Sequence, residues 1–227
     1  MTATPAPGPA TAALWEAARP VFDAVLVHPF VTGLVDGTLS RDAFRTYVVQ
    51  DSLYLRAYAR ALAVCGARAP HEDQVVMFCE HASGALAVER SLHAGFLAEL
   101  GVTAQELAGA RPTPTTLAYT SYLLATVSQA SFPEAVAAVL PCYWVYAEVG
   151  EALLERGSPD PLHRRWIDTY GGEEFGGVVR AVLGVAEEAF DRLPEPAAAS
   201  VREHYTTTTR YEWMFWDAAW RRERWPV

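Results

Sequence analysis

The sequence has 227 residues, of which 51% are hydrophobic and 20% charged, and its formal net charge at pH 7 is -9. All 18 basic residues are arginine, which excludes reactions that need a lysine, such as phosphate binding by a P-loop or Schiff-base chemistry with pyridoxal phosphate. An acidic chain without a basic run also argues against nucleic-acid binding. The size and composition predict one compact globular fold.

The chain begins with a segment rich in proline and alanine. Residues 1–12 are expected to form a flexible leader, because they lack the basic start and the apolar stretch of a signal peptide. Residues 13–227 are expected to form one all-α domain. No apolar run reaches the roughly 20 residues of a membrane span. The three cysteines form no C-x-x-C pair, which argues against a disulfide framework. A protein of the reducing cytoplasm is therefore expected.

Helical spacing of apolar residues recurs along most of the chain. Helices are predicted over 14–30, 41–69, 70–101, 117–130 and 131–157, and further helices after residues 161, 172 and 198. Short breaks rich in proline, glycine and polar residues separate them, as in helical bundles. Alternating strand patterns are absent. The sequence therefore predicts an all-α bundle of seven or eight helices.

The stretch "LPCYWVYAEVG", Leu140 to Gly150, raises the question of a catalytic thiol. Inside a helix, Pro141 removes one hydrogen bond, so the chain must kink or restart there. A restart would place Cys142 in a first turn among free N–H groups, where the pKa of a thiol falls. The alternative is a buried structural cysteine. Cys65 and Cys79 are expected to be structural, because both lie on apolar helical faces.

Two acidic residues occur on faces that should be apolar. Asp51 lies between apolar residues at helical spacing, and Tyr54 follows on the same face. Glu212 precedes Phe215 and Trp216 by three and four residues. Carboxyl groups in apolar surroundings have raised pKa values and can donate protons near neutral pH. For either residue alone, a solvated helix face is the competing interpretation.

Taken together, a thiol, two carboxyl groups and ten tyrosines favour one kind of chemistry. Aromatic walls stack on a planar ring, a carboxylate accepts hydrogen bonds from an exocyclic amine, and a thiolate adds to an electron-poor ring carbon. Covalent catalysis on an aminopyrimidine fits these groups. A Cys–His hydrolase is not indicated. A di-metal bundle needs repeated Glu-x-x-His pairs, which the sequence lacks, so no metal is expected, and haem ligation by His28 is weaker still.

Four blocks then resemble, in order and spacing, the TenA family, also called thiaminase II. They are "HPFVTGLVDGTLSRDAFRTYVVQDSLYL", "LPCYWVYAEVG", "WIDTYGGEEF" and "YEWMFWDAAW". The resemblance spans roughly Trp15 to Trp220. It implies a haem-oxygenase-like all-α fold without haem or other cofactor, and assembly as a homotetramer. It also implies hydrolysis of aminopyrimidines to 4-amino-5-hydroxymethyl-2-methylpyrimidine for thiamin salvage, with slower hydrolysis of thiamin itself.

The family's functional positions carry over block by block. The nucleophilic cysteine falls on Cys142 and the tyrosine of its block on Tyr146. The aspartate that holds the pyrimidine's amino group and ring nitrogen falls on Asp51. The aromatic residue that follows falls on Tyr54, with a stacking role.

The remaining positions lie in the second half of the chain. The tyrosine of the third block falls on Tyr170, and the glutamate of the last block on Glu212, with Phe215 beside it. A further pocket tyrosine is expected at Tyr119, with Tyr122 as the alternative. The implied catalytic pair is Cys142 and Glu212.

Two other functions compete with this prediction. The chain could be an enzyme of the same fold with a changed substrate in a biosynthetic pathway. It could instead be a regulatory protein that acts through partners, although the negative charge and the missing DNA-binding motif oppose direct contact with DNA. The residues of the four blocks are expected to contact only the pyrimidine. They therefore leave open whether the leaving group of the reaction is ammonia or thiazole.

Overall fold

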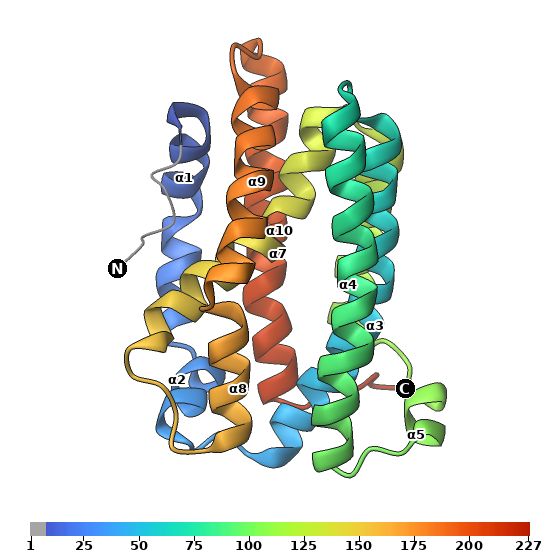
Figure 1. Ribbon diagram of the computed structural model, residues 1–227, viewed down its shortest axis with the longest axis vertical. Helices are drawn as coiled ribbons and strands as arrows, with labels where there is room; N and C mark the ends of the chain where they lie inside the picture. Colours follow the sequence, from blue (N-terminus) through green and yellow to red (C-terminus); the bar gives the residue numbers. More distant parts are fainter. Residues whose placement is uncertain (1–7) are drawn as a thin grey trace.

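The computed structural model describes residues 8–227, except for the side chains of 88–94, and every regular element in this part of the chain is an α-helix. The helices are α1 (Pro9–Leu26), α2 (Pro29–Asp36), α3 (Arg41–Arg68), α4 (Glu72–Glu99), α5 (Ala104–Gly109), α6 (Pro114–Gln129), α7 (Phe132–Leu154), α8 (Pro161–Tyr170), α9 (Glu173–Phe190) and α10 (Glu195–Trp220). Figure 1 shows the long helices running roughly along one axis. The predicted all-α class is confirmed.

The described chain has ten helices, whereas the sequence predicted seven or eight. One difference arises at Pro29, where the predicted helix over 14–30 divides into α1 and α2. The imidazole Nδ1 of His28 accepts from the backbone N–H of Phe30, so a new helix begins there. The other is the short α5, which a capping box between Thr103 and Glu106 defines.

The N-terminal segment is held by α9. The α1 helix begins at Pro9, so residues 9–12 of the predicted leader are helical, and residues 1–7 lie outside the described residues. The Glu187 carboxylate accepts from the backbone N–H groups of Ala10 and Thr11 and from the Thr11 hydroxyl. This carboxylate satisfies N–H groups that the first turn of α1 cannot pair internally.

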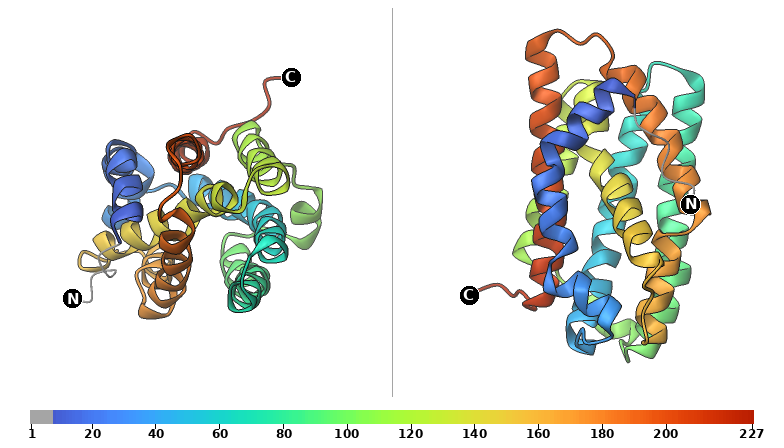
Figure 2. Two further views of the ribbon diagram at one scale, coloured as in Figure 1. Left: turned by 90° about the horizontal axis from the view of Figure 1, so that it is seen from above. Right: turned by 90° about the vertical axis from the view of Figure 1, so that its left-hand side faces the viewer.

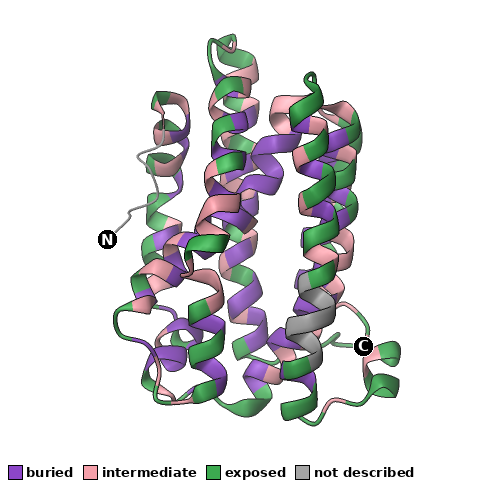
Figure 3. Cartoon of the chain, in the orientation of Figure 1, coloured by how far each residue is buried: buried purple, intermediate pink, exposed green. Residues whose placement is uncertain are grey.

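The central helix of the bundle is α7. It packs most extensively against four helices, α6, α8, α9 and α10, and it also contacts α3. Figure 2 shows the other helices around it. By length and composition α7 is apolar enough to cross a membrane, but 78% of its most apolar window is buried inside the bundle (Figure 3). A helix that is apolar on all sides suits such a central position.

Pro141 lies inside this continuous helix, so the alternative in which the helix restarts there is wrong. Pro141 removes one N–H bond, yet the packing of α7 on four neighbours keeps the helix intact through residue 154. Cys142 therefore lies well inside α7, and no first-turn N–H groups are available to stabilise its thiolate.

Gly150 allows α7 to cross the end of α8 at backbone contact distance. A Cβ atom at this position would lie 2.4 Å from the carbonyl carbon of Tyr170 and 2.5 Å from the nitrogen of Gly171. Backbone atoms cannot yield as a flexible side chain can, so only glycine fits. This crossing fixes Tyr170 against α7.

Gly150→Ala is expected to lower the free energy of unfolding by about 2–4 kcal/mol, because the two backbones must separate. Urea unfolding measures this as a lower midpoint. Gly184→Ala is the matched control, since its Cβ meets nothing within 4 Å on the exposed face of α9. That variant should match the wild type or gain up to about 1 kcal/mol. If Gly150→Ala were as stable as the wild type, the close backbone contact between α7 and the end of α8 would be refuted.

Candidate active site

A cavity of about 580 Å³ lies between α3 and α4 on one side and α7, α8 and α9 on the other. Its buried end is lined by side chains from α3 and α7: Asp51, Leu55, Tyr58, Leu62, Tyr143 and Tyr146. Cys142 and Tyr170, both partly exposed, also line it. The cavity falls within the size range of small-molecule sites.

The Cys142 thiol faces this cavity from the middle of α7. Burial raises its pKa well above the usual thiol value, and the negative charges of Glu212 and Asp51 act in the same direction. The nearby hydroxyl groups of Tyr54 and Tyr58 act in the opposite direction and lower this pKa. The predicted lowering of the thiol pKa, which required a first helical turn, is therefore wrong. At neutral pH the resting thiol is protonated.

Glu212 lies on α10 with only 1% of its surface exposed. The Tyr119 hydroxyl donates a hydrogen bond of 2.6 Å to its Oε1 atom. Burial raises the pKa of this carboxyl to about 8, the Tyr119 hydrogen bond lowers it, and the Asp51 charge raises it. The carboxyl is therefore mostly protonated at neutral pH and can donate a proton.

Asp51 places a second carboxyl group at the inner end of the cavity. It lies on α3 with 4% of its surface exposed, far from the solvated face that was the competing interpretation. Its negative charge contributes to the raised pKa values of Tyr146 and Tyr170, for which burial is the larger cause. Its carboxyl oxygens lie where a ligand in the cavity can donate to them.

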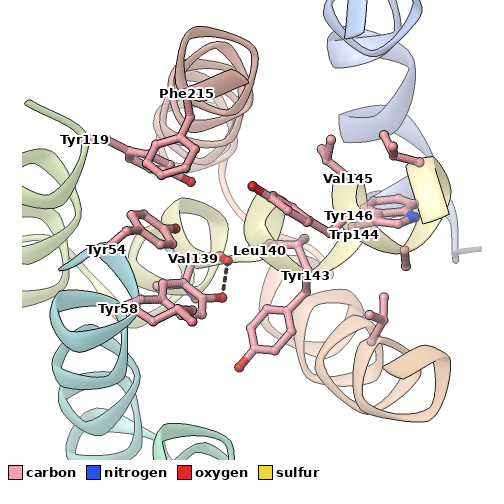
Figure 4. Close-up of a cluster of buried hydrophobic side chains, with 14 of the residues drawn as sticks. Tyr54, Tyr58, Tyr119, Val139, Leu140, Tyr143, Trp144, Val145, Tyr146 and Phe215 are labelled. Atoms are coloured by element: carbon pink, nitrogen blue, oxygen red, sulfur yellow. Dashed lines mark hydrogen bonds between the residues drawn. The ribbon is translucent and has the colours of Figure 1, made fainter. Parts of the chain in front are cut away.

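Aromatic rings form two walls around these polar groups. Tyr146 lies 5.0 Å from both Tyr170 and Trp216, measured between ring centroids. On the other side, Tyr54 lies 4.9 Å from Tyr119. Figure 4 shows Tyr54 and Tyr119 on one side and Tyr146 on the other, with a gap between them. Rings in this arrangement suit a flat ligand.

The structure brings the predicted site residues together in two layers. Asp51, Cys142, Tyr146 and Tyr170 line the cavity itself. The second layer is the buried set Tyr54, Tyr119, Glu212 and Phe215. Two interactions join the layers: the Glu212 and Cys142 groups interact electrostatically, and the Tyr54 ring lies 5.5 Å from that of Tyr58, which lines the cavity.

Tyr119, rather than Tyr122, lies beside the catalytic candidates. The Tyr122 hydroxyl instead lies 2.7 Å from Nδ1 of His204, on a partly exposed part of α6 and α10. The two tyrosines lie three residues apart on one helix and both pack on Tyr211, but only Tyr119 hydrogen-bonds to Glu212.

Sequence reasoning missed three cavity residues: Tyr58, His81 and Tyr143. The Tyr58 hydroxyl donates to the Val139 carbonyl at 2.8 Å (Figure 4), and the Tyr143 hydroxyl lies 3.1 Å from Nδ1 of His81. Tyr58 follows Tyr54 by four residues, so helical spacing alone could have placed it on the same face. No comparable signal marks His81, which reaches the cavity only because α4 packs beside α3.

The other two cysteines differ from one another. Cys65 is buried, and burial raises the pKa of its thiol to about 12, as expected for a structural cysteine. Cys79 is exposed, so the expectation that it is buried is wrong. Cys79 lies at the edge of the contact between α3 and α4, where its Sγ would be 3.3 Å from a Cβ on Gly66 of α3, whereas Phe78 and Ala82 make the buried contacts.

Among the residues that the structure describes, no group of three or more histidine, cysteine or acidic side chains is placed to hold a metal ion. The side chains of Glu89 and His93, which are four residues apart in the sequence, lie outside the described ones. The chemistry that the cavity supports is thus that of its own groups: a thiol, a proton donor and a carboxylate beside a flat slot.

Comparison with known proteins places these features in a family. Residues 15–222 match the family model described as "TENA/THI-4/PQQC family". The chain is 37% identical over 209 residues to an aminopyrimidine aminohydrolase of Bacillus subtilis (strain 168), with 92% of this chain and 89% of that protein covered.

Solved structures show the same arrangement of helices. A TenA homologue protein from P. horikoshii OT3 superposes with a TM-score of 0.86 at 29% identity, covering 93% of this chain and 98% of that one. A Shewanella denitrificans domain with a heme oxygenase-like fold superposes with a TM-score of 0.73 at 15% identity, covering 93% and 92%. The expected haem-oxygenase-like fold is confirmed.

The Glu212 environment predicts how stability depends on pH. The folded protein binds this proton more tightly than the unfolded chain, so the stabilising contribution is complete below the unfolded pKa of about 4.5 and is lost as pH rises through about 8. Glu212→Gln removes this loss. The free energy of unfolding of this variant minus that of wild type should be larger at pH 9 than at pH 5, by on the order of 3 kcal/mol.

Chemical denaturation at the two pH values measures this difference. Glu203→Gln removes an exposed carboxylate from the same helix and controls for the change of net charge. If Glu212→Gln and wild type kept the same stability difference at both pH values, Glu212 would be ionised in the folded protein and could not serve as the proton donor.

Proposed function

The chain belongs to the TENA/THI-4/PQQC family, and on that premise we propose that it is a hydrolase of aminopyrimidines, acting in thiamin salvage. The proposed reaction converts 4-amino-5-aminomethyl-2-methylpyrimidine to its hydroxymethyl form with release of ammonia, and cleaves thiamin more slowly. The observation that carries the proposal is that Cys142 and Asp51 line one cavity with aromatic walls, while the buried Glu212 interacts with both of them from a third helix.

Binding begins with the pyrimidine ring at the inner end of the cavity. The Asp51 carboxylate accepts hydrogen bonds from the exocyclic amine and fixes the orientation of the ring. Tyr146 and Tyr170, which line the cavity, stack on its faces, and Tyr54 contributes to stacking from the second layer by packing on the cavity residue Tyr58. This pose brings a ring nitrogen toward Glu212 and the adjacent ring carbon toward the Cys142 sulfur.

The two neutral groups of the resting site then act together. Glu212 donates its proton to the ring nitrogen, which makes the adjacent carbon electrophilic, and takes up the proton of the Cys142 thiol. The sulfur forms a bond to that carbon. The thiol proton thus reaches the ring through Glu212, and no charge separation is needed before substrate binds. The Tyr54 hydroxyl, which has no hydrogen-bond partner among the described residues, donates to the sulfur as it becomes negative.

The adduct next expels the leaving group. Electrons from the ring break the bond between the exocyclic methylene and nitrogen, releasing ammonia from the aminomethyl substrate or thiazole from thiamin. Water adds to the resulting methylene and loses one proton to solvent. The sulfur then departs, and the ring nitrogen's proton returns through Glu212 to the thiol as the ring regains aromaticity. Tyr146 and Tyr170 hold the water or the sulfur in place. Phe215 packs against Tyr54 and keeps this end of the site dry.

The same proposal covers the setting in which the enzyme works. We expect a homotetramer in the cytoplasm, with small pyrimidines as its ligands and neither a nucleic acid nor a membrane as a partner. The net charge of -9 supports the exclusion of nucleic acid. Size-exclusion chromatography with light scattering measures the assembly directly.

Cys142→Ser is expected to lower kcat for ammonia release by about 10³-fold or more, because a hydroxyl cannot replace the nucleophilic sulfur. Binding of the hydroxymethylpyrimidine product should stay within about threefold of wild type. The assay compares aminomethylpyrimidine and thiamin side by side, so it also identifies the leaving group. If Cys142→Ser turned over substrate at the wild-type rate, the proposed covalent step would be contradicted.

Asp51→Ala serves as the contrasting variant. Loss of the carboxylate should weaken product binding by about tenfold or more, since the exocyclic amine loses its acceptor. Purified wild-type enzyme that released ammonia from neither compound would contradict the proposed function itself.

A further inference from the structure

The outer end of the cavity is strongly acidic. Glu80 on α4, Asp168 on α8, and Glu173 and Glu174 at the start of α9 all line it and are all exposed. Among the described residues that line the cavity there is no arginine, although the chain has 18. The histidine of this lining, His81, brings no compensating charge at neutral pH, because burial lowers its pKa.

Part of this charge is neutralised from outside the cavity. Arg164 pairs with Asp168 at 2.8 Å, and Arg180 pairs with Glu173. For Glu80 and Glu174, the described part of the chain contains no arginine within ion-pair distance. Glu80 comes from α4 and Glu174 from α9, so two separate helices bring negative charge to the exposed end of the cavity, here called its entrance.

The cavity also has more room than a pyrimidine ring requires. Its volume of about 580 Å³ is typical of sites for drug-sized ligands, and a single substituted ring is much smaller. With the ring held by Asp51 at the buried end, the group attached through the exocyclic methylene extends toward the exposed end. The leaving group therefore lies in the field of the entrance carboxylates.

We propose that Glu80 and Glu174 are specificity-determining residues that select substrates with a positively charged leaving group and disfavour phosphorylated ones. The inference rests on the proposed function. A primary amine is protonated at neutral pH, and a thiazolium carries a permanent positive charge, so both are attracted. A phosphoryl group on the same substituent would lie near like charges and be repelled.

The test measures binding, so it does not depend on turnover. The double variant Glu80→Gln with Glu174→Gln should bind thiamin about 3–10-fold more weakly than wild type at low ionic strength, as expected for two carboxylates acting through solvent over several ångströms. High salt should reduce this difference. The uncharged hydroxymethylpyrimidine should bind both proteins equally, and isothermal titration calorimetry on the full chain measures each dissociation constant.

A matched double variant controls for overall charge. Asp23→Asn with Glu203→Gln removes two exposed carboxylates far from the cavity lining and should bind thiamin as wild type does. Wild type should bind thiamin monophosphate more weakly than it binds thiamin. In the Glu80→Gln with Glu174→Gln variant, the difference in affinity between these two ligands should be smaller. The inference is supported if the Glu80→Gln with Glu174→Gln variant loses affinity for thiamin but not for the uncharged pyrimidine, and if the control variant loses no affinity for thiamin.

Three results would overturn the inference. The Glu80→Gln with Glu174→Gln variant could bind thiamin as tightly as wild type, or it could lose as much affinity for the uncharged pyrimidine as for thiamin. The control variant could also lose as much affinity for thiamin as this variant does. Failure of the proposed function is a separate outcome. It would appear as absent ammonia release by wild type, whatever the calorimetry shows.

Discussion

The burial of the Glu212 carboxyl group is the constraint on which the rest of the site depends. With 1% of its surface exposed and a tyrosine hydroxyl as its hydrogen-bond donor, this group is stable mainly in its neutral form. A neutral acid beside Cys142 can release a proton to a substrate and accept one from the thiol. An exposed carboxylate at the same position would be ionised and would offer neither step.

The same burial explains why the thiol needs no activation in the resting enzyme. The helix through Pro141 carries Cys142 deep into α7, where no first-turn N–H groups lower its pKa. A permanent thiolate would repel the Asp51 charge and would be open to oxidation. A thiol that loses its proton only while the ring gains one avoids both costs. Reactivity is then coupled to the presence of substrate.

The structure also divides the cavity by function. In the proposed mechanism the inner end, with Asp51 and Cys142, binds and attacks the ring, whereas the outer end, with Glu80 and Glu174, lies beside the group attached to that ring. The tight crossing at Gly150 holds Tyr170 between these two ends. Changes at the outer end could alter the accepted leaving group without disturbing the ring site, because separate helices supply the two sets of residues.

The sequence was sufficient to predict the helical class and the residues that converge at the site. Apolar spacing marked the long helices, and a carboxyl group on an apolar face marked Asp51 and Glu212. The pattern could not show that α7 continues through Pro141, since that outcome depends on packing by four neighbouring helices. It could not place His81 or Glu80 at the cavity either, because helical periodicity does not specify which helices become neighbours.

The central claim is that the Cys142 thiol is protonated in the enzyme without substrate. The pH dependence of its alkylation tests this claim most directly. In a Cys79→Ser background, iodoacetamide labelling of Cys142 is followed by peptide mass spectrometry across a pH series, and Cys65 is buried and unreactive. The account predicts that the labelling rate at Cys142 is still rising with pH at pH 9, without a plateau. A plateau below pH 7 would show a resting thiolate and would contradict it.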